Sequence, residues 1–141
     1  MATIVHTDWL DAMLGDPTHS AVDFDTDNID ASLLDETDSG TITAANVDYD
    51  EVDGATVVAT EDVGVSAVTD GVVSLTGAVT FSEVTGDAAD YLVVWKNSGS
   101  AATSPLIITW DSASTGLPVT PNGGDITATW GSSTLVTLAA A

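Results

Sequence analysis

Short runs of apolar and β-branched residues recur along this chain from residue 29 onward, and Gly, Asp, Asn or Pro separates one run from the next. Val, Ile, Thr and Trp favour extended backbone, whereas the residues between the runs favour turns. The pattern predicts strands at residues 29–34, 41–45, 55–60, 72–75, 79–84, 91–96, 106–110, 126–130 and 134–138. We therefore expect an all-β fold, an antiparallel β-sandwich or barrel-like single domain with a short N-terminal helix.

Polarity within the runs indicates how each strand is covered. Residues 91–95 and 106–110 are apolar almost throughout. These strands should lie centrally, with both sides covered by the protein itself or one side covered by another subunit. Ile126, Ala128 and Trp130 alternate with threonines, which predicts one buried and one solvated face.

The N-terminal segment shows a different spacing. Residues 7–14 (TDWLDAML) place their apolar side chains on one side of a helix, with Thr7 or Asp8 as N-cap and Gly15 at the end. This apolar face covers the end of a sheet or docks on a neighbouring subunit. The candidate subunit-contact residues are Trp9, Leu10, Met13 and Leu14. We expect residues 1–20 to form an N-terminal arm containing this helix, and residues 21–141 to form the β-sandwich domain.

Charge narrows the range of partners. The 141 residues include 22 Asp and Glu against a single basic residue, Lys96, and the formal net charge is −21. Binding to nucleic acid or to an anionic membrane depends on Lys and Arg, so we expect neither partner. Repulsion among the carboxylates disfavours the compact state at low salt, but at about 1 M salt the Debye length is only roughly 3 Å, so we expect a salt-rich, marine or halophilic setting. Fourteen acids fall in residues 1–53, which predicts two faces of different charge.

One acidic segment is a candidate metal site. Asp23, Asp25 and Asp27 alternate in a segment that opens like a calcium-binding loop, because hard cations prefer several carboxylate oxygens. The EF-hand pattern requires Gly at the sixth position and Glu at the twelfth, where this chain has Asn28 and Leu34. A calcium site of another type and a solvated acidic loop both remain open.

Motifs for catalysis are absent from the sequence. The chain has no Cys and no Gly-x-Ser-x-Gly, His-Glu-x-x-His, phosphate-loop or dinucleotide-binding motif. His6 and His19 are the only imidazoles, and nothing marks one serine as a nucleophile. We therefore predict no enzymatic activity and no required cofactor, with calcium as the one candidate ligand.

The tryptophans and the lone lysine have simpler interpretations than ligand binding. Trp95, Trp110 and Trp130 end strand patterns, which favours packing in the core or at a subunit contact over a platform for a glycan. Trp9 lies in the helix pattern. Lys96 follows Trp95 and is expected to reach a carboxylate at a strand end. The N-terminus has no basic region followed by a long apolar stretch, and no apolar run approaches ~18 residues, so we expect synthesis in the cytoplasm without export or a membrane span.

Two blocks of sequence carry a resemblance to a known family. The first is residues 115–127 (TGLPVTPNGGDIT), preceded by a strand pattern ending in Asp111 and followed by a Thr-x-Trp strand. The second is residues 79–87 (VTFSEVTGD), which leads into the apolar run of residues 91–96 (YLVVWK). In content and order these blocks resemble small structural proteins of tailed-bacteriophage virions, the capsid decoration or cement-like β-sandwich family. Unlike those relatives, this chain has almost no Lys or Arg.

The resemblance implies a structural role. It implies a protein that decorates and cements the outer surface of a tailed-phage capsid as a homo-trimer, through non-covalent contacts with the major capsid protein. A heavily acidic outer face would then keep neighbouring copies and particles apart. A phage tail, neck or fibre-associated structural protein and a calcium- or glycan-binding β-module are the alternatives.

Overall fold

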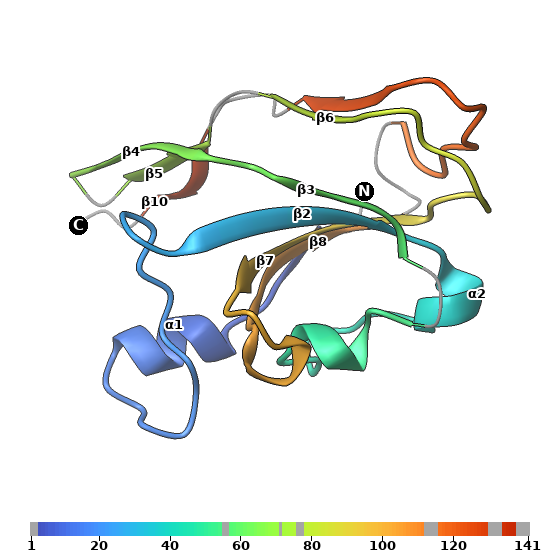
Figure 1. Ribbon diagram of the computed structural model, residues 1–141. Coiled ribbons are helices and arrows are strands. Elements are labelled where there is room, and N and C mark those ends of the chain that lie inside the picture. Colours follow the sequence, from blue (N-terminus) through green and yellow to red (C-terminus); the bar gives the residue numbers. More distant parts are fainter. Residues whose placement is uncertain are drawn as a thin grey trace.

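The all-β class is confirmed by the structure, a computed structural model that describes residues 3–54, 57–70, 72–75, 78–111, 116–129 and 134–137. The strands in this part of the chain form three antiparallel sheets, and the helices are short. Figure 1 shows the two smaller sheets together on one side of the largest sheet.

The largest sheet has five strands in the order β1-β8-β7-β2-β3, and every neighbouring pair is antiparallel. Its strands are β1 (Thr3–Val5), β2 (Asn28–Leu34), β3 (Val57–Asp62), β7 (Tyr91–Asn97) and β8 (Leu106–Trp110). β7 occupies the centre, and residues 91–95 are all buried. This confirms the central position that the unbroken apolar run predicts.

Two smaller sheets cover one face of this sheet (Figure 1). One has the order β10-β5-β4 and the other is the pair β6-β9. Their strands are β4 (Val65–Thr69), β5 (Val72–Leu75), β6 (Ala78–Phe81), β9 (Ile126–Thr129) and β10 (Thr134–Thr137). In β9, Ile126 and Ala128 are half-buried while Thr127 and Thr129 are exposed, which confirms the predicted alternation for these four residues.

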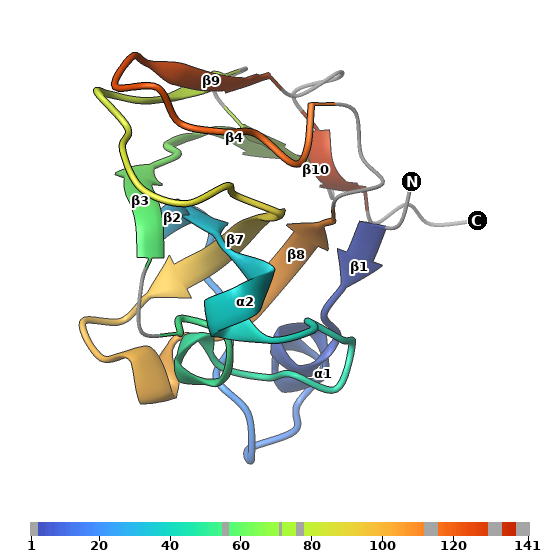
Figure 2. The same cartoon turned by 90° about the vertical axis from the view of Figure 1, so that its right-hand side faces the viewer.

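Helices occur in the connections between strands. They are α1 (Asp8–Met13), α2 (Glu36–Ser39) and the 3₁₀ helices η1 (Tyr49–Glu51) and η2 (Ala101–Thr103). Figures 1 and 2 show α1 and η1 on the side of the five-stranded sheet opposite the smaller sheets. Within the described residues, no helix has the length and apolar character needed to cross a bilayer.

Apolar side chains on the two faces of the five-stranded sheet form two clusters. The larger cluster joins Ile29, Ala31 and Leu33 of β2 to residues of β5 and β6. The smaller cluster joins side chains of β7 and β8 to Ile42 and Tyr49. The sheet is therefore covered on both faces, which explains the nearly unbroken apolar runs of β7 and β8.

The two blocks that carry the family resemblance lie side by side in the fold. β6 pairs with β9 in a continuous register from Ala78↔Thr129 to Phe81↔Ile126. Beyond the strands, Val84 accepts a hydrogen bond from Gly123 N–H and donates one to the Gly124 carbonyl. Residues 79–87 and 116–127 are thus one structural unit, although almost thirty residues separate them in the sequence.

Some predicted elements are wrong or incomplete. Residues 41–45 form a turn rather than a strand, because Asn46 Oδ1 accepts hydrogen bonds from the backbone N–H and hydroxyl of Thr43. The strands β1 and β4 and the short helix α2 are not expected from the sequence pattern. Trp130 and residues 55, 56 and 138, which the predicted strands include, lie outside the described residues.

The acid-rich N-terminal third of the sequence contributes helices to one side of the five-stranded sheet (Figure 1). Fourteen of the 22 acidic residues belong to residues 1–53. That segment provides α1, α2, η1 and their connections, and α1 and η1 lie on the side of the sheet away from the smaller sheets (Figure 1). We call this side, formed by α1, η1 and the loops next to them, the acidic layer.

Candidate functional site

The four candidate contact residues of α1 divide into two pairs. Trp9 is only 1% exposed and contacts Phe24 edge to face, with ring centroids 5.4 Å apart. Leu10 also packs against the larger cluster. In contrast, Met13 is 46% exposed and Leu14 is 80% exposed. The helix therefore covers the core with one pair, as one of the two alternatives predicts, and leaves the other pair in solvent.

Acidic side chains border the exposed pair. The Asp11 carbonyl accepts hydrogen bonds from the backbone N–H groups of Leu14 and Asp16, at 3.1 and 3.0 Å, so these three residues lie together. Asp11 and Asp16 are both exposed. Hydrogen bonds from the Thr18 hydroxyl and N–H lower the pKa of Asp16, so this carboxylate is ionised at neutral pH. We call Asp11, Met13, Leu14 and Asp16 the α1 tip.

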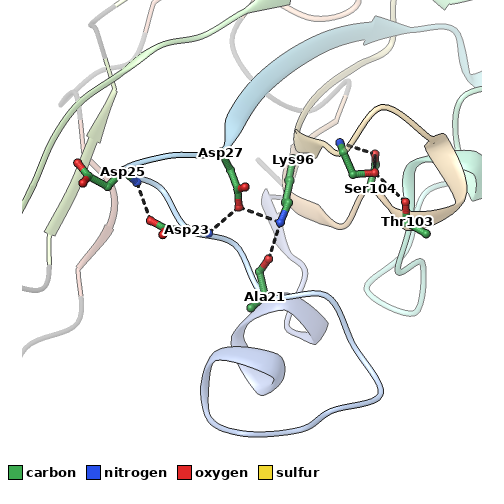
Figure 3. A network of polar contacts seen from close by, with 8 residues as sticks. Ala21, Asp23, Asp25, Asp27, Lys96, Thr103 and Ser104 are labelled. Carbon is green, nitrogen blue, oxygen red and sulfur yellow. Dashed lines mark hydrogen bonds and ion pairs between the residues drawn. The ribbon is translucent and has the colours of Figure 1, made fainter.

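The lone lysine holds the loop that follows α1 to the five-stranded sheet. Lys96 Nζ lies 2.8 Å from Asp27 Oδ2 and donates a hydrogen bond of 2.9 Å to the Ala21 carbonyl (Figure 3). The expectation that Lys96 reaches a carboxylate is confirmed. Burial opposes ionisation of Asp27, but the hydrogen bonds from Lys96 and Asp23 N–H and the lysine charge outweigh it and lower the pKa.

Two of the three candidate calcium ligands accept hydrogen bonds from other groups of the chain. Asp27 Oδ2 accepts from both Lys96 and the Asp23 backbone, and Asp23 Oδ1 accepts from the Asp25 N–H. The Asp25 carboxylate points away from Lys96 and Asp27 (Figure 3). Among the described residues, no three His, Cys, Asp or Glu side chains are grouped so that they could hold a metal ion. Asp23 and Asp27 therefore bond to groups of this loop and of β7.

His6 is fully buried and connects β1 to two other parts of the fold. Its Nδ1 lies 2.9 Å from the Asn46 carbonyl and its Nε2 lies 3.0 Å from Thr109 Oγ1. The carbonyl accepts only, so Nδ1 carries the proton and Nε2 of the neutral ring accepts from the Thr109 hydroxyl. Burial lowers the pKa of His6, against the opposing effects of the Asn46 hydrogen bond and the nearby acids Asp8 and Glu51. His6 therefore acts as a structural link.

His19, the second imidazole, lies in the acidic layer. Its Nε2 is 3.5 Å from Asp8 Oδ1, and both side chains are partly exposed. His19 is thus paired with the first residue of α1, whereas His6 lies in the interior.

A buried polar junction at Ser32 was not expected from the sequence. Ser32 lies in β2 and is fully buried. Its Oγ accepts hydrogen bonds from the Tyr49 hydroxyl and from Trp95 Nε1, both at 2.9 Å, and lies 2.8 Å from Thr60 Oγ1. Since two donors already point at this oxygen, the serine proton goes to Thr60. The only signal in the sequence is a serine among the apolar residues Ala31, Leu33 and Leu34 of β2.

Aromatic stacking completes this junction. The rings of Tyr49 and Trp95 stack with centroids 3.8 Å apart and planes within 5° of parallel. Burial raises the pKa of Tyr49, and the hydrogen bonds to Ser32 and Thr60 oppose the rise only in part, so the hydroxyl remains a donor at neutral pH. Trp95 is buried, as the core interpretation predicts, and it binds no external group through its indole nitrogen because Ser32 takes that donor.

Asp30 is a second buried polar residue of β2. Its two carboxylate oxygens accept hydrogen bonds from Asn28 Nδ2 at 3.0 Å and Asn97 Nδ2 at 2.8 Å. Burial raises the pKa of Asp30, and the neighbouring charges of Asp62 and Glu61 act in the same direction while the two asparagines oppose it. The carboxylate is directed at amide groups of its own chain, which is a structural rather than a catalytic arrangement.

Comparisons with known proteins add no family. The chain matches no protein-family model, and no curated protein matches it. Of the features described above, the α1 tip is the one that combines exposed apolar side chains with charge, whereas His6, Ser32 and Asp30 direct their polar atoms into the fold.

Proposed function

We propose that this chain is a structural virion protein that decorates the outer surface of a tailed-phage capsid and stabilises it through non-covalent contacts with the major capsid protein. The observation that carries this proposal is the pairing of residues 79–87 with residues 116–127 through β6, β9 and the hydrogen bonds of Val84. These are the two blocks that resemble the decoration family. Their pairing means that the resemblance follows one folded unit rather than two unrelated stretches.

The interior of the protein supports a mechanical role. The five-stranded sheet is covered on both faces, and the buried polar side chains of Ser32, His6 and Asp30 bond to groups of the same chain. A domain built in this way binds as a preformed body and loses little conformational entropy on docking. Binding to the assembled capsid then stabilises the assembly by mass action.

The surface supports attachment by a small apolar contact within a charged surround. Met13 and Leu14 are exposed large apolar residues at the end of a helix whose other side, at Trp9, is fixed in the core. A second subunit that covers them removes apolar surface from water, which favours association. Three copies arranged as a trimer would each carry a charge of −21, so trimer formation should require salt or a partner that supplies positive charge.

Copy number in purified virions tests the proposal. Quantitative mass spectrometry would measure this chain against the major capsid protein of the same particles. We expect a fixed ratio near one to one, or another large constant fraction. A few to a few dozen copies per particle would assign the chain to the tail or neck instead, and absence from particles would refute a structural role.

A further inference from the structure

We infer that the α1 tip is the attachment surface, and that the partner presents an apolar pocket bordered by Lys and Arg side chains. The inference deepens the proposed function and rests on it, because the partner meant is the major capsid protein. It is carried by three observations: two large apolar residues are exposed, two exposed acids lie beside them, and the only lysine is bonded elsewhere in the molecule.

The apolar centre of this surface is Leu14 with Met13. Leu14 is 80% exposed and Met13 is 46% exposed, although Met13 is the last residue of a helix whose Trp9 is 1% exposed and Leu14 follows it directly. The backbone that presents them is held by three hydrogen bonds, from Leu14 N–H to Leu10 and Asp11 and from Gly15 N–H to Ala12. The exposed pair is therefore held in place from behind, as an anchor that enters a pocket should be.

The border of this surface is anionic. Asp11 and Asp16 lie next to Leu14 through the hydrogen bonds to the Asp11 carbonyl, and Thr18 donates two hydrogen bonds to the Asp16 carboxylate. The last turn of α1 has no basic residue, so its exposed carbonyl end adds to the negative potential. An anionic border disfavours any partner of the same sign and attracts one of the opposite sign.

Charge also decides against a second copy of this chain as the occupant. The chain has one basic side chain, Lys96, and its ammonium group is already bonded to Asp27 and Ala21. A neighbouring copy therefore has no free lysine or arginine to place opposite Asp11 and Asp16. Two copies that met at this surface would bring together acids from two chains of net charge −21. The occupant is a protein of different sequence with a basic rim.

This assignment changes the orientation that composition alone suggests. A heavily acidic face is expected to point outward, away from the particle. The structure places α1 within the acidic layer, on the side of the five-stranded sheet opposite the smaller sheets (Figure 2). If α1 is the contact, the acidic layer faces the capsid and the smaller sheets, which include the β6-β9 unit, face outward.

A double variant tests the apolar centre. Met13→Ser together with Leu14→Ser should weaken binding of the purified chain to particles that lack it by about tenfold or more, because burial of a leucine side chain contributes on that scale. The matched control is Val68→Ser, because Val68 is 48% exposed but belongs to β4, in the layer opposite α1. The control should bind as the unchanged protein does. Thermal unfolding of both variants should match it, since all three side chains are exposed.

Charge variants test the basic rim of the partner. Asp11→Asn together with Asp16→Asn should slow association and weaken its dependence on salt between about 0.1 and 1 M, since fewer opposite charges are then in place. Asp87→Asn, at an exposed acid in the loop after β6, is the control. If removing the two acids strengthens binding, the partner surface is not basic and the inference is wrong.

The outcomes separate this inference from the proposed function. If native particles contain this chain in high copy number but the Met13 and Leu14 variant binds particles lacking it as tightly as the unchanged chain does, the surface alone is overturned. Absence of the chain from particles overturns the function together with the surface. Self-association of the isolated chain that the same variant abolishes would identify a second copy as the occupant and overturn the assignment to a basic partner.

Discussion

Ser32 is the position at which loss of one oxygen atom should reduce stability most. It is fully buried in β2, and its hydroxyl bonds to Tyr49, Trp95 and Thr60. In Ser32→Ala the Tyr49 hydroxyl can still turn to Thr60, but the indole N–H of Trp95 has no remaining acceptor at this junction. A buried donor without a partner costs about 1–3 kcal/mol, and each lost hydrogen bond adds about 1 kcal/mol.

We therefore expect Ser32→Ala to lower the free energy of unfolding by about 2–4 kcal/mol, a large part of the 5–15 kcal/mol typical of a domain. Urea unfolding followed by tryptophan fluorescence, at constant high salt, measures this change. With a slope of about 1–3 kcal/mol/M, the unfolding midpoint should fall by roughly 1–2 M. Thr60→Ser is the matched control, because it keeps the hydroxyl to which Ser32 donates and Thr60 is exposed, so its cost should be at most about 0.5 kcal/mol.

Tyr49→Phe completes a double-mutant cycle with Ser32→Ala. Alone it removes one of the two donors to Ser32, at a cost of about 1 kcal/mol. Because both residues belong to one junction, the double variant should be more stable than the sum of the two losses predicts, by about 0.5–1 kcal/mol. Strict additivity, or a loss below about 0.5 kcal/mol for Ser32→Ala, would refute the shared junction.

Three further changes test separate parts of the fold. Gly54→Ala should lower the free energy of unfolding in urea by about 2–4 kcal/mol, because φ is +55° and the new Cβ would lie 2.8 Å from the Asp38 carbonyl carbon. Gly99→Ala is the control: φ is +88° but no atom lies within 4 Å of the new Cβ, so the loss should be only about 1–2 kcal/mol. Equal losses would contradict the close approach at Gly54. Burial lowers the pKa of His6 below the usual 6.5, so on acidification the imidazole is protonated in the unfolded chain before it is protonated in the folded protein. The free energy of unfolding should therefore fall, relative to that of His6→Asn, as the pH falls from 7.5 through 6.5. A difference in stability between the two proteins that stays constant with pH would be the contrary result. Lys96→Met should lower the unfolding midpoint at low salt more than at about 1 M salt, because it leaves the partly buried Asp27 carboxylate unpaired in a chain of net charge −21. An effect independent of salt would argue against a contribution of the Lys96–Asp27 ion pair to stability.

The sequence pattern predicts an element of this fold well where the element depends on residues within a few positions of one another. Residues 72–75 and 106–110 are strands with the predicted bounds, because each run of β-branched or apolar residues is closed by turn residues or a polar segment. The helix at residues 8–13 follows in the same way from the spacing of Trp9, Leu10 and Met13. These elements depend on neighbours within a few positions.

Elements that depend on distant partners are harder to predict. β1 has only three residues, and its pairing with β8 joins Val5 to Ile108, far apart in the sequence. Ser32 and His6 each look like ordinary polar residues until the fold brings Trp95 and Thr109 to them, from 63 and 103 positions away. The predicted strand at residues 41–45 is wrong for the opposite reason, because the nearby Asn46 side chain accepts hydrogen bonds from Thr43 that compete with strand pairing.

The candidate site shows the same limit. The sequence places Trp9, Leu10, Met13 and Leu14 on one helix, but only packing decides which of them remain exposed. Lys96 is correctly expected to meet a carboxylate, yet the identity of Asp27 depends on a loop whose other contact lies 75 positions away in the sequence. The residue type therefore predicts the kind of interaction that Lys96 makes, whereas the fold determines which carboxylate it contacts.

The contact between Lys96, Asp27 and Ala21 has a consequence for the ions around the molecule. With its single lysine already engaged, the protein must recruit its counter-charge from dissolved cations, and 22 acidic side chains hold a dense ionic atmosphere around each copy. A partner that supplies lysine and arginine displaces part of that atmosphere into bulk solution, where the released ions gain translational entropy. Docking would then be accompanied by measurable cation release, and its driving force would depend on the monovalent salt activity of the surrounding medium.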